Sequence, residues 1–227
     1  MMLEHTDTYA PRNRYGALTT FPDFVRPLLS EAEQAGAWTT GIESDRQQRG
    51  SAINVDVYGY DSADELAIVQ VREARFRPGW HTAVRKDYYL IGRTETGSVF
   101  AHPVKSPARS KRALESPLAC VKWVLAQIWQ CRAEELEDIE RQGDVAFVPV
   151  RSCPKSAFQV NGPIRLRDSH ELTGEIWRYG DTYYVRRGAR LAHLKRQHKR
   201  IRAREGWYRV QVGVRESVWG FTAPKGD

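Results

Sequence analysis

A helical pattern of apolar residues in the middle of the chain divides two stretches whose patterns are typical of β-strands. Ser116 suits an N-cap position, Pro117 suits the first position of a helix, and Gly143 ends the pattern. We therefore expect one connecting helix over residues 113–142 that joins two β-rich parts. The apolar residues that recur at helical spacing are Leu118, Val121, Leu125, Ile128, Leu136 and Ile139.

The N-terminal part combines a helical segment with strand patterns. Residues 21–36 suit a short helix. Val55 and Val57 alternate with polar neighbours, which predicts a half-buried strand, and further β-rich runs follow. Residues 1–20 show no period and are expected to form a flexible arm. Residues 21–112 are then a small domain in which a helix lies beside a β-sheet.

The C-terminal part shows several short strand patterns separated by turns that contain glycine. In one of them, Gly180 and Asp181 separate two β-rich runs, as in a hairpin. Short strands at this spacing predict a compact antiparallel β-barrel or sandwich over residues 143–227. The expected fold class of the whole chain is therefore α+β.

The positive charge of the chain is concentrated in this C-terminal part. The chain carries 35 basic and 28 acidic side chains, and its formal net charge is +7. Residues 143–227 alone contain 17 basic and 8 acidic side chains. Residues 186–204, which we call the basic block, contain nine basic residues and no acid. Because like charges at this density repel one another, the block predicts a polyanionic partner.

The most common polyanion is nucleic acid. Arginine outnumbers lysine in the block by seven to two, and its planar fork binds phosphate through two hydrogen bonds. Tyr183 and Tyr208 border the block and are candidate platforms on which bases stack. Since the chain has no recognition-helix or RNP motif, we expect an accessory protein that binds RNA or single strands without catalysis. The predicted nucleic-acid-binding residues are Arg186, Arg187, Arg190, Lys195, Arg196, Lys199, Arg200, Arg202, Arg204, Tyr183 and Tyr208.

Two other functions stay open on the sequence. An adaptor would dock an acidic partner on the basic block, and Trp123 and Trp129 of the central helix would offer a protein partner an apolar surface. A nuclease would hold a metal ion with carboxylates and hold phosphate with the cations. Its candidate residues are Asp168, His170, Glu171 and Glu175. No known catalytic motif is present, so catalytic residues are not assigned.

Metal ions, cofactors and membranes are not expected as partners. Cys120, Cys131 and Cys153 are an odd number of cysteines without a Cys-x-x-Cys pair, which disfavours disulfides and zinc sites. No apolar run approaches the roughly 18 residues of a membrane helix, and the first residues lack a secretory pattern. We therefore expect a cytoplasmic protein.

Three segments of the C-terminal part resemble, in order and spacing, an uncharacterised family of bacterial and phage-borne β-rich proteins. The segments are residues 142–150, 171–175 and 206–210. The family carries His-x-His after the Thr-Gly step and His-x-x-His before the Gly-Trp-Tyr step. Here residues 175–177 and 195–198 occupy those places, and only His198 remains. The resemblance implies a β-rich module, and the missing histidines favour binding over catalysis.

Overall fold

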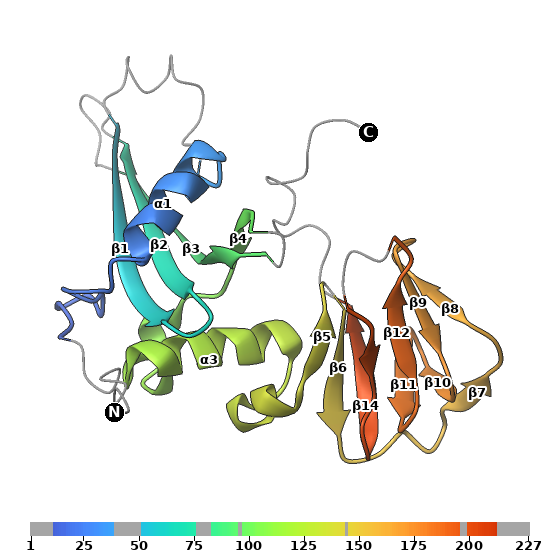
Figure 1. Cartoon of the computed structure of the whole chain (residues 1–227). Helices are drawn as coiled ribbons and strands as arrows, with labels where there is room; N and C mark the ends of the chain where they lie inside the picture. The colour runs from blue at the N-terminus through green and yellow to red at the C-terminus, as the bar shows by residue number, and fades with distance from the viewer. Residues whose placement is uncertain are drawn as a thin grey trace, which may run out of the picture. The chain divides into compact units, whose positions relative to one another are not determined.

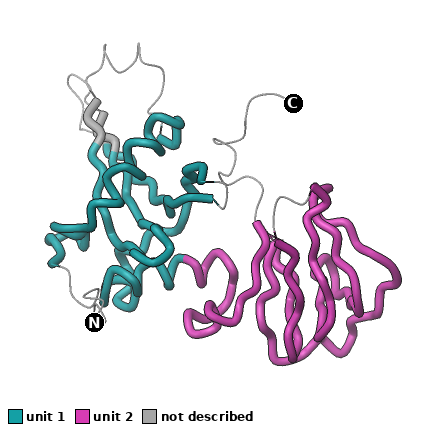
Figure 2. The backbone as a smooth tube through the Cα atoms, viewed as in Figure 1, with its two compact units in different colours: residues 1–124, 215–227 teal, residues 125–214 magenta. Residues whose placement is uncertain are grey.

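The protein is described by a computed structural model that covers residues 11–38, 51–75, 83–94, 97–143, 145–195 and 199–212. Figure 2 shows its two compact units: unit 1 is Met1–Val124 with Arg215–Asp227, and unit 2 is Leu125–Val214. The described residues form helices and three sheets in which every strand pairing is antiparallel. This confirms the expected α+β class, with strands predominating.

Unit 1 is built on a four-stranded antiparallel meander. The strands pair in the order of the sequence, and a register shift between Val57 and Gly59 bends the first of them. One face of the sheet carries a core that includes Val57, Val69 and Ile91. Alternation in this part of the chain therefore predicted a strand correctly. The strands are β1 (Ser51–Asp61), β2 (Leu66–Arg75), β3 (Ala83–Arg93) and β4 (Val99–Pro103).

Helix α1 (Val25–Gln34) lies against this sheet (Figure 1). Val25, Leu28 and Ala32 are buried, and their spacing places them on one side of the helix. Pro27 is tolerated because it stands in the first turn, where backbone N–H groups have no partner within the helix. Gly36 follows the helix with φ of +82°, a conformation that glycine adopts without strain.

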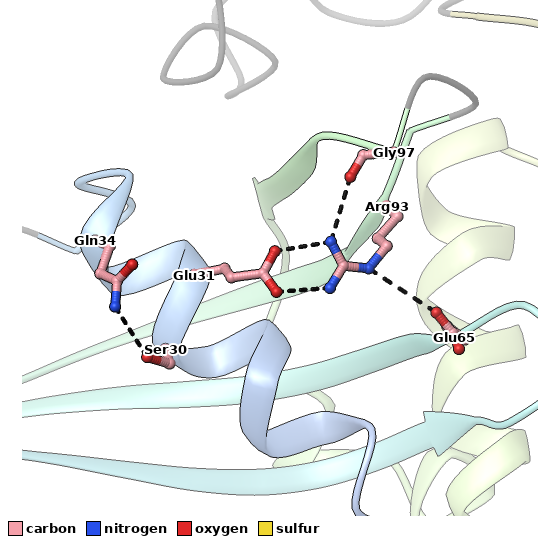
Figure 3. Close-up of polar contacts among 6 residues, drawn as sticks. All are labelled: Ser30, Glu31, Gln34, Glu65, Arg93 and Gly97. Atoms are coloured by element: carbon pink, nitrogen blue, oxygen red, sulfur yellow. Dashed lines mark hydrogen bonds and ion pairs between the residues drawn. The ribbon is translucent and has the colours of Figure 1, made fainter.

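An arginine and a glutamate tie α1 to the sheet (Figure 3). The guanidinium of Arg93, on β3, donates two parallel hydrogen bonds of 2.7 Å to the carboxylate of Glu31 on α1. It also donates to the carbonyl oxygen of Gly97, and Glu65 lies 4.0 Å away. The hydrogen bonds from Arg93 lower the pKa of Glu31. This pair shows how the chain satisfies an arginine with its own acids.

Residues 11–20 differ from the flexible arm that the sequence predicted. Ala17 and Leu18 are buried, and Arg12 and Leu18 form a bridge between two short extended segments. The guanidinium of Arg12 donates to the carbonyl oxygens of Gly16 and Tyr58 at 2.7 Å and of Leu114 at 3.1 Å. These contacts hold the segment in unit 1. Residues 1–10 lie outside the described residues.

The central helix is shorter than predicted. Helix α3 (Pro117–Trp129) begins as expected, since the backbone N–H of Ala119 donates to the hydroxyl of Ser116 at 3.0 Å. It ends at Trp129 because Gln130 adopts a left-handed conformation, with φ of +52°. The boundary between the two units falls within α3.

A short helical turn and a strand follow α3 where the sequence predicted more helix. They are η3 (Ala133–Asp138) and β5 (Glu140–Gln142). Leu136 and Ile139 still pack against the cluster around Trp129. Their helical spacing therefore reflects packing against this cluster and does not mean that the helix continues. Two further helical turns, η1 (Pro107–Arg109) and η2 (Arg112–Leu114), precede α3.

Unit 2 consists of two antiparallel sheets that share one core. The strand order of the first sheet is β5-β6-β14-β11-β10-β7, and that of the second is β13-β12-β9-β8. In the first sheet the further strands are β6 (Val145–Val150), β14 (Trp207–Val212), β11 (Thr182–Arg186), β10 (Ile176–Tyr179) and β7 (Phe158–Val160). The second contains β13 (Ile201–Arg202), β12 (Arg190–His193), β9 (His170–Thr173) and β8 (Ile164–Leu166).

The core of unit 2 lies between the two sheets. Phe147, Ile176 and Val185 contribute from the six-stranded sheet, and Leu172 and Leu191 contribute from the four-stranded one. Neither sheet closes on itself among the described residues, because each has two edge strands. A closed barrel is therefore not seen in this part of the chain, and the two sheets share one core. Each of the two sheets presents an outer face away from this core.

Candidate nucleic-acid interface

The two-residue period of the strands decides where the basic block points. In β12, Leu191 is buried in the core, so Arg190 points to the outer face of the four-stranded sheet. In β13, Ile201 packs against the core and Arg202 is exposed on the outer face. The outward residues of this sheet, which we call the arginine face, are Arg165, Glu171, Thr173, Arg190, Ala192 and Arg202.

Arg190 and Arg202 stand directly opposite each other on neighbouring strands. Thr173 of β9 is the next residue in the same row, opposite Arg190 on its other side. Neither arginine has an ion pair or hydrogen bond from its side chain to any residue that the structure describes. Two positive charges therefore face solvent side by side without an acidic partner among the described residues.

Three other predicted arginines are paired with acids of unit 2. Each of these acids lies outside the basic block in the sequence, and all three arginines are exposed. The hydrogen bond from Arg186 lowers the pKa of Glu175 below its ordinary value. These residues are thus less available to an external anion than their place in the sequence suggested. The pairs are Arg186 with Glu175, Arg187 with Glu205, and Arg204 with Glu140.

The connection between β12 and β13 holds the rest of the block. Lys195, Lys199 and Arg200 are exposed there, and none of them forms an ion pair with a residue in the described ranges. Arg196 lies outside the described residues. The cations of the block that lack an ion pair with a described residue are therefore on the arginine face and in the loop that joins its two strands.

The two tyrosines predicted as stacking platforms do not point outward. Tyr208 is only 6% exposed, and its ring packs against that of Phe147 with centroids 6.2 Å apart. Burial raises the pKa of its hydroxyl. Tyr183 is half-buried and packs against the same core. The prediction is wrong for Tyr208, because Trp207 and not Tyr208 occupies the outward position of β14.

A different set of aromatic residues does face outward, from the six-stranded sheet. Trp177, Tyr184 and Trp207, which we call the aromatic face, are half-buried and alternate with core residues of β10, β11 and β14. Trp177 stands opposite Tyr184, and the rings of Trp177 and Trp207 meet edge to face with centroids 4.8 Å apart. The guanidinium of Arg186 lies 5.3 Å from the centre of the Trp177 ring. Alternation from Val185 indicates Tyr184 as an outward residue, whereas Trp177 and Trp207 follow only from the pairing of β10 and β14 with β11.

Part of the six-stranded sheet is covered by the segment that ends α3. Trp129 is 7% exposed and packs against Ala146 and Val148 of β6. Arg209 of β14 donates to the carbonyl oxygens of Trp129 at 2.9 Å and Gln130 at 3.0 Å, which caps the end of the helix. Trp129 is therefore a core residue and not the exposed docking residue that the adaptor hypothesis required.

The four residues proposed for a nuclease centre do not converge. His170 is buried opposite His193, with ring centroids 4.8 Å apart, whereas Glu171 is on the outer face of the same strand. Glu175 is paired with Arg186, and Asp168 lies in an exposed turn. Among the residues that the structure describes, no group of three His, Cys, Asp or Glu side chains is arranged to hold a metal ion.

The thiols of the chain are not arranged as nucleophiles. Cys120 is buried where α3 approaches β1, and burial raises the pKa of its thiol to about 12. A Cβ on Gly59 would lie 2.4 Å from the Cβ of Cys120, so only glycine allows this approach. The pKa values of Cys131 and Cys153 are also raised, in both cases mainly by burial. A thiolate is therefore disfavoured at all three positions.

Comparison of the chain with protein-family models, with curated proteins and with solved structures found no match. The likeness of residues 142–210 to a bacterial and phage-borne family stays a prediction. No helix among the described residues is long and apolar enough to span a bilayer. The functional argument therefore depends on the site itself.

Proposed function

We propose that the protein is a non-catalytic nucleic-acid-binding subunit whose contacts are made by the arginine face and by the loop between β12 and β13. The observation that carries the proposal is the division of the basic block. Three arginines of the block are paired with acids, whereas Arg190 and Arg202 stand on one exposed face without an acidic partner among the residues that the structure describes. A polyanion supplies the missing negative charge.

Phosphate is the group that this surface suits. The surface presents guanidinium forks and ammonium groups, which are the usual donors to phosphate oxygens. Its described residues present no aromatic ring, because Tyr208 is in the core and the outward rings of Trp177, Tyr184 and Trp207 belong to the other sheet. Contacts to the backbone alone carry no sequence information. The proposal is therefore sequence-independent binding, and the preference for RNA or single strands loses the support of Tyr208.

The salt dependence of binding tests the proposal. The affinity for a fluorescently labelled oligonucleotide should fall linearly with the logarithm of the salt concentration. Replacing Lys199, Arg200 and Arg202 together with alanine should weaken binding and reduce the slope by about one for each contact that is lost. Arg187→Ala is the control, since Arg187 is paired with Glu205 and its loss should change the slope little. An oligonucleotide that is not retained at low salt would overturn the proposal.

An acidic protein is the alternative partner, since carboxylates also bind guanidinium forks. The structure favours it less, because Trp129 is buried and offers no apolar surface. Competition between the oligonucleotide and polyglutamate distinguishes the two partners. The proposal also places the protein in the cytoplasm, where nucleic acid is accessible, and cell fractionation tests that location.

A further inference from the structure

The arginine face contains a pair of like charges in the position where a sheet tolerates them least. Residues directly opposite on antiparallel strands have Cβ atoms about 4.5–5.5 Å apart, and like charges at these positions destabilise the sheet. Arg190 and Arg202 occupy such positions. The same face shows the ordinary arrangement nearby, because Arg165 stands opposite Glu171. The unfavourable pair is therefore a local feature of one row and not a property of the whole face.

No described acid forms an ion pair with Arg190 or Arg202. The third residue in the row, Thr173, is neutral, and Arg200 of the adjoining loop adds a further positive charge. Other arginines of the chain have an acid that accepts their hydrogen bonds, as Arg93 has Glu31 and Arg187 has Glu205. An unrelieved pair of like charges is typical of sites that bind an oppositely charged ligand, where stability is exchanged for function.

We propose that Arg190 and Arg202 together form a phosphate-binding site for the phosphodiester groups of a nucleic-acid strand. This inference rests on the proposed function, and it assigns the main anion contact to one row of the four-stranded sheet. The two guanidinium groups donate to phosphate oxygens from neighbouring strands. The hydroxyl of Thr173, beside Arg190 in the row, is in place as a third donor. Bound phosphate cancels the repulsion between the arginines.

The inference predicts that the unliganded site reduces stability. In a buffer of low ionic strength without phosphate, Arg190→Gln should raise the Tm of the full-length protein by about 1–3 °C, because it removes the repulsion. Arg202→Gln should do the same. Arg165→Gln is the matched control, since it removes the same charge from the same face but faces Glu171, and it should leave the Tm unchanged or lower it. A lower Tm in both Arg190→Gln and Arg202→Gln would overturn the inference.

Inorganic phosphate tests the ligand directly. At constant ionic strength, replacing chloride with phosphate should raise the Tm of the wild-type protein, and this increase should be absent in Arg190→Gln. Arg190→Lys keeps the charge but lacks the fork, so it should lose most of the phosphate effect. An equal phosphate effect in wild type and Arg190→Gln would contradict the inference.

The labelled oligonucleotide separates the two proposals. Arg190→Gln should weaken its binding about tenfold, which is the effect of losing one charge-assisted contact, and Arg165→Gln should weaken it much less. If Arg190→Gln and Arg165→Gln weaken the binding of the oligonucleotide to the same extent, the proposed function stands and the inference fails. If the oligonucleotide does not bind at all, the proposed function fails with it. If polyglutamate competes as well as the oligonucleotide, the partner is an acidic protein and the inference is wrong.

Discussion

Arginines on the outer faces of the two sheets in unit 2 differ in whether they have partners within the protein. On the six-stranded sheet, Arg186 has Glu175 and the ring of Trp177 as partners, and Arg209 caps the end of α3. On the four-stranded sheet, Arg190 and Arg202 face each other without a described acid. The same residue type therefore stabilises the fold on one face and is left for an external anion on the other. Density of charge in a sequence does not distinguish these two uses.

The largest change in stability is expected on replacing Arg209, because its hydrogen bonds stabilise the fold. Arg209→Ala removes its donors to the carbonyl oxygens of Trp129 and Gln130 and should lower the free energy of unfolding by about 2 kcal/mol. Denaturant titration measures this loss. Arg209→Lys keeps a positive charge near the helix end and should recover part of the stability. An unchanged midpoint in Arg209→Ala would mean that this face does not depend on its arginines.

The next effect concerns the aromatic face. Trp177→Ala removes the contacts of this ring with Trp207 and Arg186, and it should reduce the free energy of unfolding by about 1–2 kcal/mol. The affinity for an oligonucleotide should stay within about twofold of wild type, because the account places no base on this ring. If a base did stack there, the variant would lose about 1–3 kcal/mol of binding free energy. A loss of affinity of tenfold or more in a folded Trp177→Ala variant would place bases on the aromatic face and break the comparison.

The smallest effect is the pH dependence of the Arg186–Glu175 pair. The folded-state pKa of Glu175 is lowered by its hydrogen bond with Arg186. The pair therefore stabilises the fold above the ordinary carboxyl pKa of about 4.3, and this contribution is lost as the pH falls through the lower folded value. The Tm of Glu175→Gln should be slightly below that of wild type at neutral pH, and the two should converge in acid. A difference that persists in acid would exclude the ion pair as its source.

Much of the fold followed from local patterns in the sequence. Strand alternation and the Ser116 cap are local features, and they predicted the β-rich units and the start of α3 correctly. The end of α3 did not follow, because Leu136 and Ile139 keep the helical spacing while Gln130 turns left-handed. The spacing records packing against β6, which only the folded unit reveals.

Less of the candidate site could be predicted from the sequence. The basic block and its position in the C-terminal part are visible in the sequence, but the pairing of its arginines is not. Glu175 and Glu205 lie 11 and 18 residues from their partners in the chain, and the turns and sheets bring them together. Choosing between Trp207 and Tyr208 as the outward residue required knowledge of which side of β14 meets the core.

One measurement compares the arginines of the basic block that have an acidic partner with those that have none among the described residues, in two variants of equal net charge. The double variant Arg190→Gln, Arg202→Gln and the double variant Arg186→Gln, Arg187→Gln each remove two positive charges, the first from the unpaired arginines and the second from the paired ones. The affinity for a labelled oligonucleotide and its salt slope are measured for both. The account predicts that the first variant loses affinity and about two units of slope while the second stays close to wild type. Equal losses in the two variants would contradict it, because binding would then depend on net charge and not on the arginine face.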